Sequence, residues 1–381
     1  MASHSIARYR FHLQQRPVIL VGLTVIAVVF FLAVTGLSRA HQAQRQALGN
    51  RWFNRGVAEL NAKRFDAAVT DFRAALLYSP DQYSYQLNLA EALIGEGHRA
   101  QAWAYLMNLR DREPDDGLVS LELARIAAQR GETDDAVRYY HNAVYAVWPA
   151  EQEGRRLNAR LELIELLLQT GSKAQAQGEL IALAESIGPD PVQQERIGEL
   201  FLRAGDYEHA LGAFSAVLKA DPHHASAMAG AGHAAFELRR FPLAQRYLQA
   251  AVRANANDTA SEERLKATQL VVDMDPFRRQ LAANERDRIV VQAFQTAGER
   301  LRSCKMPAVT AASAGARPTL KDAWARLKPQ ITEQGLRRNP DLMETAMDLV
   351  FRIERDTSAV CGSPTGTDLA LLLIANMHEG T

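Results

Sequence analysis

Residues 49–82 read GNRWFNRGVAELNAKRFDAAVTDFRAALLYSPDQ, and the pattern of this stretch decides the fold because it recurs along the chain. Its small, aromatic and proline positions are Trp52, Gly56, Ala68, Phe72, Ala75 and Pro80. Aligned at a period of about 34 residues, later stretches keep alanine at the twentieth position. These alanines are Ala68, Ala102, Ala136, Ala176, Ala210 and Ala244. The periodicity predicts six repeats within residues 49–258, namely 49–82, 83–116, 117–150, 157–190, 191–224 and 225–258.

This pattern resembles the tetratricopeptide repeat (TPR) family, in which each unit is a pair of antiparallel helices. Small side chains at the eighth, twentieth and twenty-seventh positions allow two helix backbones to approach closely. The turn inside a unit is expected at a glycine that adopts the left-handed conformation. The candidates are Gly97, Gly131, Gly171 and Gly205. Proline near the end of a unit stops the second helix, so the expected fold is an all-α solenoid.

The residues beyond the repeats are expected to form capping helices over 259–303 and a small helical region over 304–381. The first capping helix is expected to carry its N-terminal signal at Ser261, and a long helix is expected over 277–303. A linker is predicted from Met306 to Pro318. Three shorter helices are predicted at Leu320 to Gln334, Asp341 to Arg355 and Asp368 to Met377.

Cys304 and Cys361 are the two cysteines of the chain, and they flank these shorter helices. Their spacing matches no paired-cysteine metal motif. A disulfide between them is one possibility, which an exported region would favour. Two unrelated free thiols are the other.

The N-terminal region contains a candidate membrane span. Residues 18–37 are mostly apolar and uncharged, and their length as a helix is about 30 Å, enough for one bilayer crossing. They are preceded by a basic tail, 1–17, and followed by a linker, 38–48. A buried core helix is disfavoured because the apolar residues lie all round the helix. A signal peptide cleaved after the small residues Ser38 and Ala40 is the closer alternative to an uncleaved signal anchor.

The orientation of the span in the membrane is predicted from the basic residues on either side of it. Three arginines, Arg8, Arg10 and Arg16, precede it, and four, Arg39, Arg45, Arg51 and Arg55, follow it. A short basic tail without acidic residues before a first span usually stays in the cytoplasm. The C-terminal bulk is therefore expected to be periplasmic or extracytoplasmic.

Composition and motifs argue against several function classes. Lysine plus arginine and aspartate plus glutamate number 44 each, so no excess charge recommends a nucleic acid partner. No phosphate-binding loop, serine-hydrolase elbow or His-Glu-x-x-His helix is present, so neither a cofactor nor enzymatic activity is predicted, although residues 304–381 are left open. His223, His224 and His233 lie near one another in sequence, but no metal site is predicted there.

A peptide-binding groove is what the family resemblance implies, on the inward face of each first helix. The residues predicted to line it are Asn50, Phe53, Val57, Leu60, Asn61, Leu121, Arg125, Leu161, Glu165, Glu195, Glu199, Arg203, His233, Phe236 and Glu237. They favour an amphipathic or mildly basic protein segment, while a solvated face without a partner remains the alternative. The carboxylate clamp of chaperone-binding family members is absent, because Phe53, Val57, Leu118 and Glu122 stand where its polar and basic groups would be needed.

We therefore predict a membrane-anchored TPR scaffold for protein–protein interactions, of the kind found in the bacterial cell envelope. Two alternatives remain: an accessory or catalytic protein with its activity in the C-terminal region, and a repeat adaptor tethered on the cytoplasmic side. No oligomeric state is predicted.

Overall fold

The computed structural model describes residues 5–188, 190–304 and 319–378, and side-chain surroundings from residue 21 onwards. Every regular element in these ranges is helical. The predicted linker 306–318 lies outside the described residues, as do the side chains of the predicted basic tail 1–17. The chain divides into two compact units, residues 1–167 and residues 168–381.

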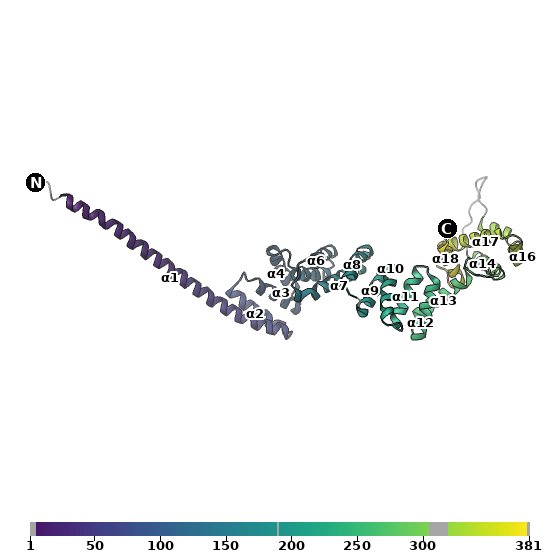
Figure 1. The fold of residues 1–381 in the computed structure, drawn as a ribbon, viewed down its shortest axis with the longest axis horizontal. Coiled ribbons are helices and arrows are strands. Elements are labelled where there is room, and N and C mark those ends of the chain that lie inside the picture. Colours follow the sequence, from purple (N-terminus) through teal and green to yellow (C-terminus); the bar gives the residue numbers. More distant parts are fainter. Residues whose placement is uncertain (1–4, 189, 305–318, 379–381) are drawn as a thin grey trace. The chain divides into compact units, whose positions relative to one another are not determined.

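The first helix, α1, runs without interruption from Ser5 to Asn61 (Figure 1). It includes the predicted span 18–37, the segment 38–48 and the first helix of the first repeat. The predicted linker is therefore helical and continuous with the repeat. The described part, Val21–Asn61, contains an apolar window with a mean hydropathy of 2.4 that is 0% buried, so it is not a core helix. Such a window is typical of a membrane span or of a signal sequence.

The rest of the first unit consists of antiparallel helix pairs. Its helices are α2 (Phe65–Tyr78), α3 (Tyr83–Glu96), α4 (Arg99–Arg112), α5 (Gly117–Gln129), α6 (Thr133–Tyr145), the short 3-10 helix η1 (Ala150–Gln152) and α7 (Glu153–Gln169), whose last residues belong to the second unit. The alanines at the twentieth repeat position, Ala68, Ala102 and Ala136, are fully buried. A Cβ atom at Gly56 would come within 2.7 Å of the Phe72 ring, which shows how closely α1 and α2 approach.

The second unit continues the same pattern and then departs from it. Its repeat helices are α8 (Lys173–Ser186), α9 (Pro191–Ala204), α10 (Tyr207–Ala220), α11 (Ala225–Glu237) and α12 (Phe241–Ala254), followed by α13 (Thr259–Met274). Ala176, Ala210 and Ala244 are fully buried. The turn glycines of both units adopt the expected left-handed conformation, with φ between 75° and 92°. They are Gly97, Gly131, Gly171 and Gly205.

The C-terminal helices share one apolar core with α12 and α13. They are α14 (Ala283–Ser303), α15 (Leu320–Leu327), α16 (Glu333–Arg338), α17 (Asp341–Cys361) and α18 (Gly366–Met377). Val271 and Met274 of α13 belong to the same core cluster as Leu371 and Ile374 of α18. The solenoid therefore ends against a helical cap that covers its last apolar face.

Four predicted details of this region are wrong. Residues 277–282 are not helical, so α14 is shorter than expected. The helix predicted from Leu320 to Gln334 is two helices, because the chain turns around Pro329. Helix α17 continues beyond Arg355 to Cys361. The N-cap of α13 is Asp258, whose carboxylate accepts a hydrogen bond from the Ser261 amide, and not Ser261 itself.

Candidate partner-binding surfaces

The first unit carries a charged cluster on its first helices. Arg125 of α5 donates hydrogen bonds to both carboxylate oxygens of Glu162 on α7, at 2.6 and 2.9 Å, and a third to Glu122 at 2.6 Å. The Tyr140 hydroxyl donates to Glu162 at 3.0 Å. Arg155 of α7 forms an ion pair of 3.5 Å with Glu91 of α3. The cluster therefore joins three successive first helices.

Burial governs the electrostatics of this cluster. The pKa values of Glu91 and Glu122 are raised because burial disfavours the charged carboxylate, and the neighbouring arginines oppose that rise. Hydrogen bonding to Glu162 raises the pKa of Arg125. Since the carboxylates are already engaged by Arg125 and Arg155, the cluster fixes the spacing of the helices.

The structure separates the predicted groove residues of the first unit into core and surface. Leu121 is only 1% exposed, so its assignment to a binding surface is wrong. Phe53 is half-buried and stacks on Tyr85, with ring centroids 4.8 Å apart, and Asn50 accepts a hydrogen bond from the same tyrosine. Val57, Leu60, Leu161 and Glu165 are half-buried, and Asn61 is exposed.

A cleft of about 740 Å³ lies in the second unit, on the face formed by the first helix of each repeat. It is bounded by α9, α11 and α13. It exists because α11 presents the small residues Ala225, Ser226 and Ala229 to it. A Cβ atom at Gly230 would lie 2.4 Å from the Phe214 ring, so this glycine lets α11 pack directly on α10. The cleft has an apolar floor wide enough for a side chain of a partner.

Charged and polar groups surround this floor. Glu195 of α9 accepts a hydrogen bond from the Ser226 hydroxyl and lies 3.6 Å from His224. His233 lies 3.5 Å from Glu237, and burial is the main cause that lowers the pKa of this histidine. Glu199 of α9 is exposed, and Arg264 of α13 also lines the cleft. A partner would therefore meet carboxylates on α9 and a guanidinium on α13.

Of the groove residues predicted in the second unit, the cleft brings together Glu199 and His233 in its lining. Phe236 instead packs edge-on against Phe241, at 5.6 Å between centroids, and contributes to the core. Glu237 and Arg203 are exposed. Ser226 was not among the named groove residues, although it stands at the second position of the sixth unit, as Asn50 does in the first. The repeat pattern did not point to Arg264, because α13 lies beyond the sixth unit. Extending the repeat register past Asp258 would have placed Arg264 on a seventh first helix.

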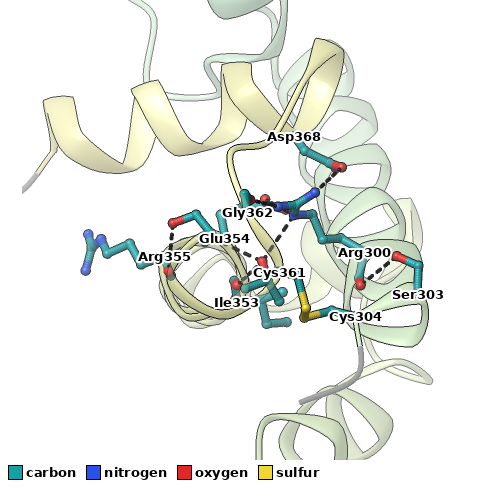
Figure 2. A network of polar contacts seen from close by, with 11 residues as sticks. Arg300, Ser303, Cys304, Ile353, Glu354, Arg355, Cys361, Gly362 and Asp368 are labelled. Carbon is teal, nitrogen blue, oxygen red and sulfur yellow. Dashed lines mark hydrogen bonds and ion pairs between the residues drawn. A yellow bond between two sulfur atoms is a disulfide. The ribbon is translucent and has the colours of Figure 1, made fainter.

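A second polar cluster lies inside the C-terminal core (Figure 2). Arg300 of α14 donates hydrogen bonds to the Thr357 hydroxyl at 3.2 Å and to the Gly362 carbonyl at 2.9 Å. It also lies 3.7 Å from the Glu354 carboxylate and 3.6 Å from that of Asp368. One helical turn further on, Cys304 is joined to Cys361 by a disulfide. Arg300 and the disulfide thus tie the ends of α14 and α17 together.

Glu354 is the most constrained member of this cluster. Its side chain is 0% exposed, and within the described residues neither carboxylate oxygen has a hydrogen-bond partner. Burial raises its pKa to about 8, with a smaller contribution from the Asp368 charge, while Arg300 lowers it. Across the residues that the structure describes, no group of histidine, cysteine, aspartate and glutamate side chains is arranged to hold a metal ion.

Comparison with known proteins identifies the repeats. The family model described as tetratricopeptide repeat matches residues 53–97, 87–151 and 196–261. No curated protein matches this chain significantly in sequence. Among solved structures, YrrB, a TPR protein described as having an unusual peptide-binding site, is 17% identical, with 50% of this chain and 95% of that chain covered and a TM-score of 0.41.

Two further solved structures are similar at the same level. Pseudomonas aeruginosa PilF is 14% identical, with 58% of this chain and 97% of that chain covered and a TM-score of 0.40. The C-terminal part of a TPR protein from Cytophaga hutchinsonii is 13% identical, covering 62% of this chain and 92% of its own, at a TM-score of 0.43. The repeat spacing, the buried alanines and the matched family model together show that this chain contains tetratricopeptide repeats.

Proposed function

We propose that this protein is a membrane-anchored scaffold that binds a segment of another protein on the first-helix faces of its repeats. TPR domains typically mediate protein–protein interactions, and stacked repeats present extended surfaces suited to that role. The observation that carries the anchor is that the apolar window found from Val21 onwards, where the described side chains begin, is 0% buried and lies in a helix that continues into the first repeat. So large an exposed apolar surface calls for a lipid environment.

The cleft between α9, α11 and α13 is the surface that best fits a partner segment. It combines an apolar floor at Ala225 and Ala229 with exposed charge at Glu199. An amphipathic segment would place an apolar side chain on the floor and a basic one against the α9 carboxylates. The charged cluster around Arg125 in the first unit is internally paired and is the weaker candidate.

A pull-down with cleft variants tests this binding surface. We expect the double variant Glu199→Arg, Ala229→Phe to lose co-purifying partners, because it reverses the exposed charge and fills the floor. Gln193→Arg is the matched control, since it changes charge on an exposed residue of α9 outside the lining. Retention of every partner by the double variant, with its helical circular dichroism intact, would contradict the proposal. Substituting Phe53, Leu121 and Phe236 would not test it, since Leu121 is buried and the two phenylalanine rings pack against Tyr85 and Phe241.

We also propose that the C-terminal bulk faces the periplasm or another extracytoplasmic space. The support is the Cys304–Cys361 pairing, because disulfides persist in oxidising compartments and are rare in the cytosol. Protease added to spheroplasts is expected to digest the C-terminal region. Protection from protease, together with two reactive thiols in freshly lysed cells, would favour the cytoplasm-facing adaptor instead.

Extraction tests the anchor itself. We expect the protein to remain in the membrane fraction after alkaline carbonate treatment and to keep its N-terminal residues. A mature chain beginning after Ala40 would instead show that the apolar stretch is a cleaved signal peptide.

A further inference from the structure

A polar pocket lies where the exposed apolar stretch of α1 ends. It is formed by residues 38–46 of α1 and by the end of α2 with the following turn, 78–82. The lining consists of Ser38, His41, Gln42, Arg45, Gln46, Tyr78, Ser79, Pro80, Asp81 and Gln82. Its volume is about 460 Å³. The pocket belongs wholly to the first unit, and no feature of the partner-binding cleft contributes to it.

The continuity of α1 determines how far this pocket lies from a bilayer. A helix rises about 1.5 Å per residue, so Ser38 to Gln42 occupy the first ~8 Å beyond Leu37. The polar headgroup layer on each side of a bilayer is roughly 5–8 Å thick. These residues therefore fall at headgroup depth when the preceding apolar residues span the membrane. Arg45 stands about 12 Å beyond Leu37, just past that layer, and its side chain is long enough to extend to it.

The chemistry of the lining suits a phosphodiester. Gln42, Gln46 and Ser79 provide neutral hydrogen-bond donors, and Arg45 provides a permanent cation. The Arg45 guanidinium already donates to the Leu77 carbonyl at 3.2 Å, which holds the side chain across the pocket at the C-terminal end of α2. Asp81 is the carboxylate of the lining. Outside the lining, Arg39 and Arg51 add positive charge on the same helix, whose stretch from 38 to 55 contains no acidic residue.

The end of α2 packs on α1 beside the pocket. Tyr78 lies against α1, where a Cβ atom at Gly49 would lie 3.4 Å from the Tyr78 Cβ. Gly49 stands about 18 Å beyond Leu37 along the helix, so this contact forms the wall of the pocket on the side away from the apolar stretch.

We infer that the pocket between residues 38–46 of α1 and the α2–α3 turn binds the headgroup of one anionic phospholipid. This inference rests on the proposed membrane span. The bound lipid would hold the first repeat against the bilayer surface, because the pocket joins α1 to the end of α2. Arg45 would contact the phosphate, and the glutamine and serine side chains would hydrogen-bond its ester oxygens or a headgroup hydroxyl.

Native mass spectrometry of the full chain in detergent tests the inference. Phosphatidylglycerol and phosphatidylcholine are added separately, and the fraction of protein that retains one lipid is measured. We expect phosphatidylglycerol to be retained preferentially, and the double variant Arg45→Gln, His41→Gln to lose at least about fivefold of that retention, as expected for loss of one cation at an anionic surface. Arg73→Gln is the control, because Arg73 is exposed on α2 and bonds Gln101 instead.

Three results would overturn the inference: equal retention of the two lipids, unchanged retention in the double variant, or displacement of the lipid by millimolar inorganic phosphate, which would make free phosphate the ligand. The anchor is tested separately. If carbonate leaves the wild type in the membrane while lipid retention is unselective, this inference alone fails. If carbonate releases the wild type, the anchor fails as well.

Discussion

Two repeat turns adopt a left-handed conformation without glycine. Lys63 and Arg239 have φ values of 57° and 58°, at the fifteenth position of the first and sixth units. The other four units have glycine there. A side chain in this conformation costs about 1–2 kcal/mol relative to glycine, because its Cβ crowds the backbone. The turn is therefore required by the packing of the helix pair and is retained even where the residue disfavours it.

Lys63→Gly is expected to stabilise the first unit by about 0.5–1 kcal/mol, since the strain relieved exceeds the extra entropy that glycine has in the unfolded chain. This change in stability is measured as the difference in the free energy of unfolding between variant and wild type in urea. Lys266→Gly is the matched control. It places glycine at an exposed position in the interior of α13 and should destabilise by about 1 kcal/mol. A destabilised Lys63→Gly variant would show that the turn is not strained.

Glu354 makes stability depend on pH. Its folded-state pKa, about 8, lies above its ordinary value of 4.5, so its full contribution to stability is present below pH 4.5 and is lost as the pH rises through about 8. Glu354→Gln removes the titrating group from the core. We expect the variant to differ little from the wild type at pH 4.5 and to be more stable at pH 9, by up to about 5 kcal/mol for a pKa raised from 4.5 to about 8. Thermal unfolding at both pH values measures this, and a pH-independent difference would contradict it.

At the scale of elements, contacts between helix ends stabilise the C-terminal region. The last residue of α17, Cys361, is bonded to Cys304 just after α14, and Arg300 one turn earlier contacts the loop that follows α17. The two contacts act on the same pair of helix ends. Loss of one leaves the other in place, so the region is expected to loosen without losing its helices.

Replacing both Cys304 and Cys361 with serine is expected to lower the stability of this region by about 4 kcal/mol, the loop-entropy value for a separation of 57 residues. Trp324, which stacks on Phe294 at 5.6 Å, reports the C-terminal core by fluorescence. Adding reductant to the wild type should reproduce the serine variant. An unchanged denaturation midpoint would show that the crosslink adds no stability.

At the scale of the whole molecule, the two ends of the chain differ in what they contribute to folding. The apolar stretch of α1 is 0% buried, whereas α13 and the helices after it cover Phe241 and the residues around it. Deleting residues 1–37 should therefore leave the melting temperature of the repeats unchanged. Truncation after Asp258 should lower it and expose apolar surface, measured by dye binding. A truncated chain as stable as the full one would show that the cap is dispensable.

Much of this architecture follows from the sequence. The small residues at fixed spacing identify the helix pairs, because only alanine or glycine lets two backbones approach so closely. The exposure of the groove residues was harder to predict from the sequence. Leu121 and Phe236 share a repeat register with surface residues, yet neighbouring helices bury the first and hold the second against the core. Burial at such positions depends on the sizes of side chains from adjacent units, which no single repeat contains.

The sequence by itself determined the all-α repeat, the turns and the apolar stretch, since each depends on local spacing or local composition. Only the tertiary structure decided that α1 joins the apolar stretch to the first repeat without a break and that α11 leaves a cleft. It also placed Glu354 inside the core next to Arg300. The cleft and the burial of Glu354 arise from contacts between segments distant in the sequence, and the energies of such contacts depend on which groups exclude water from one another.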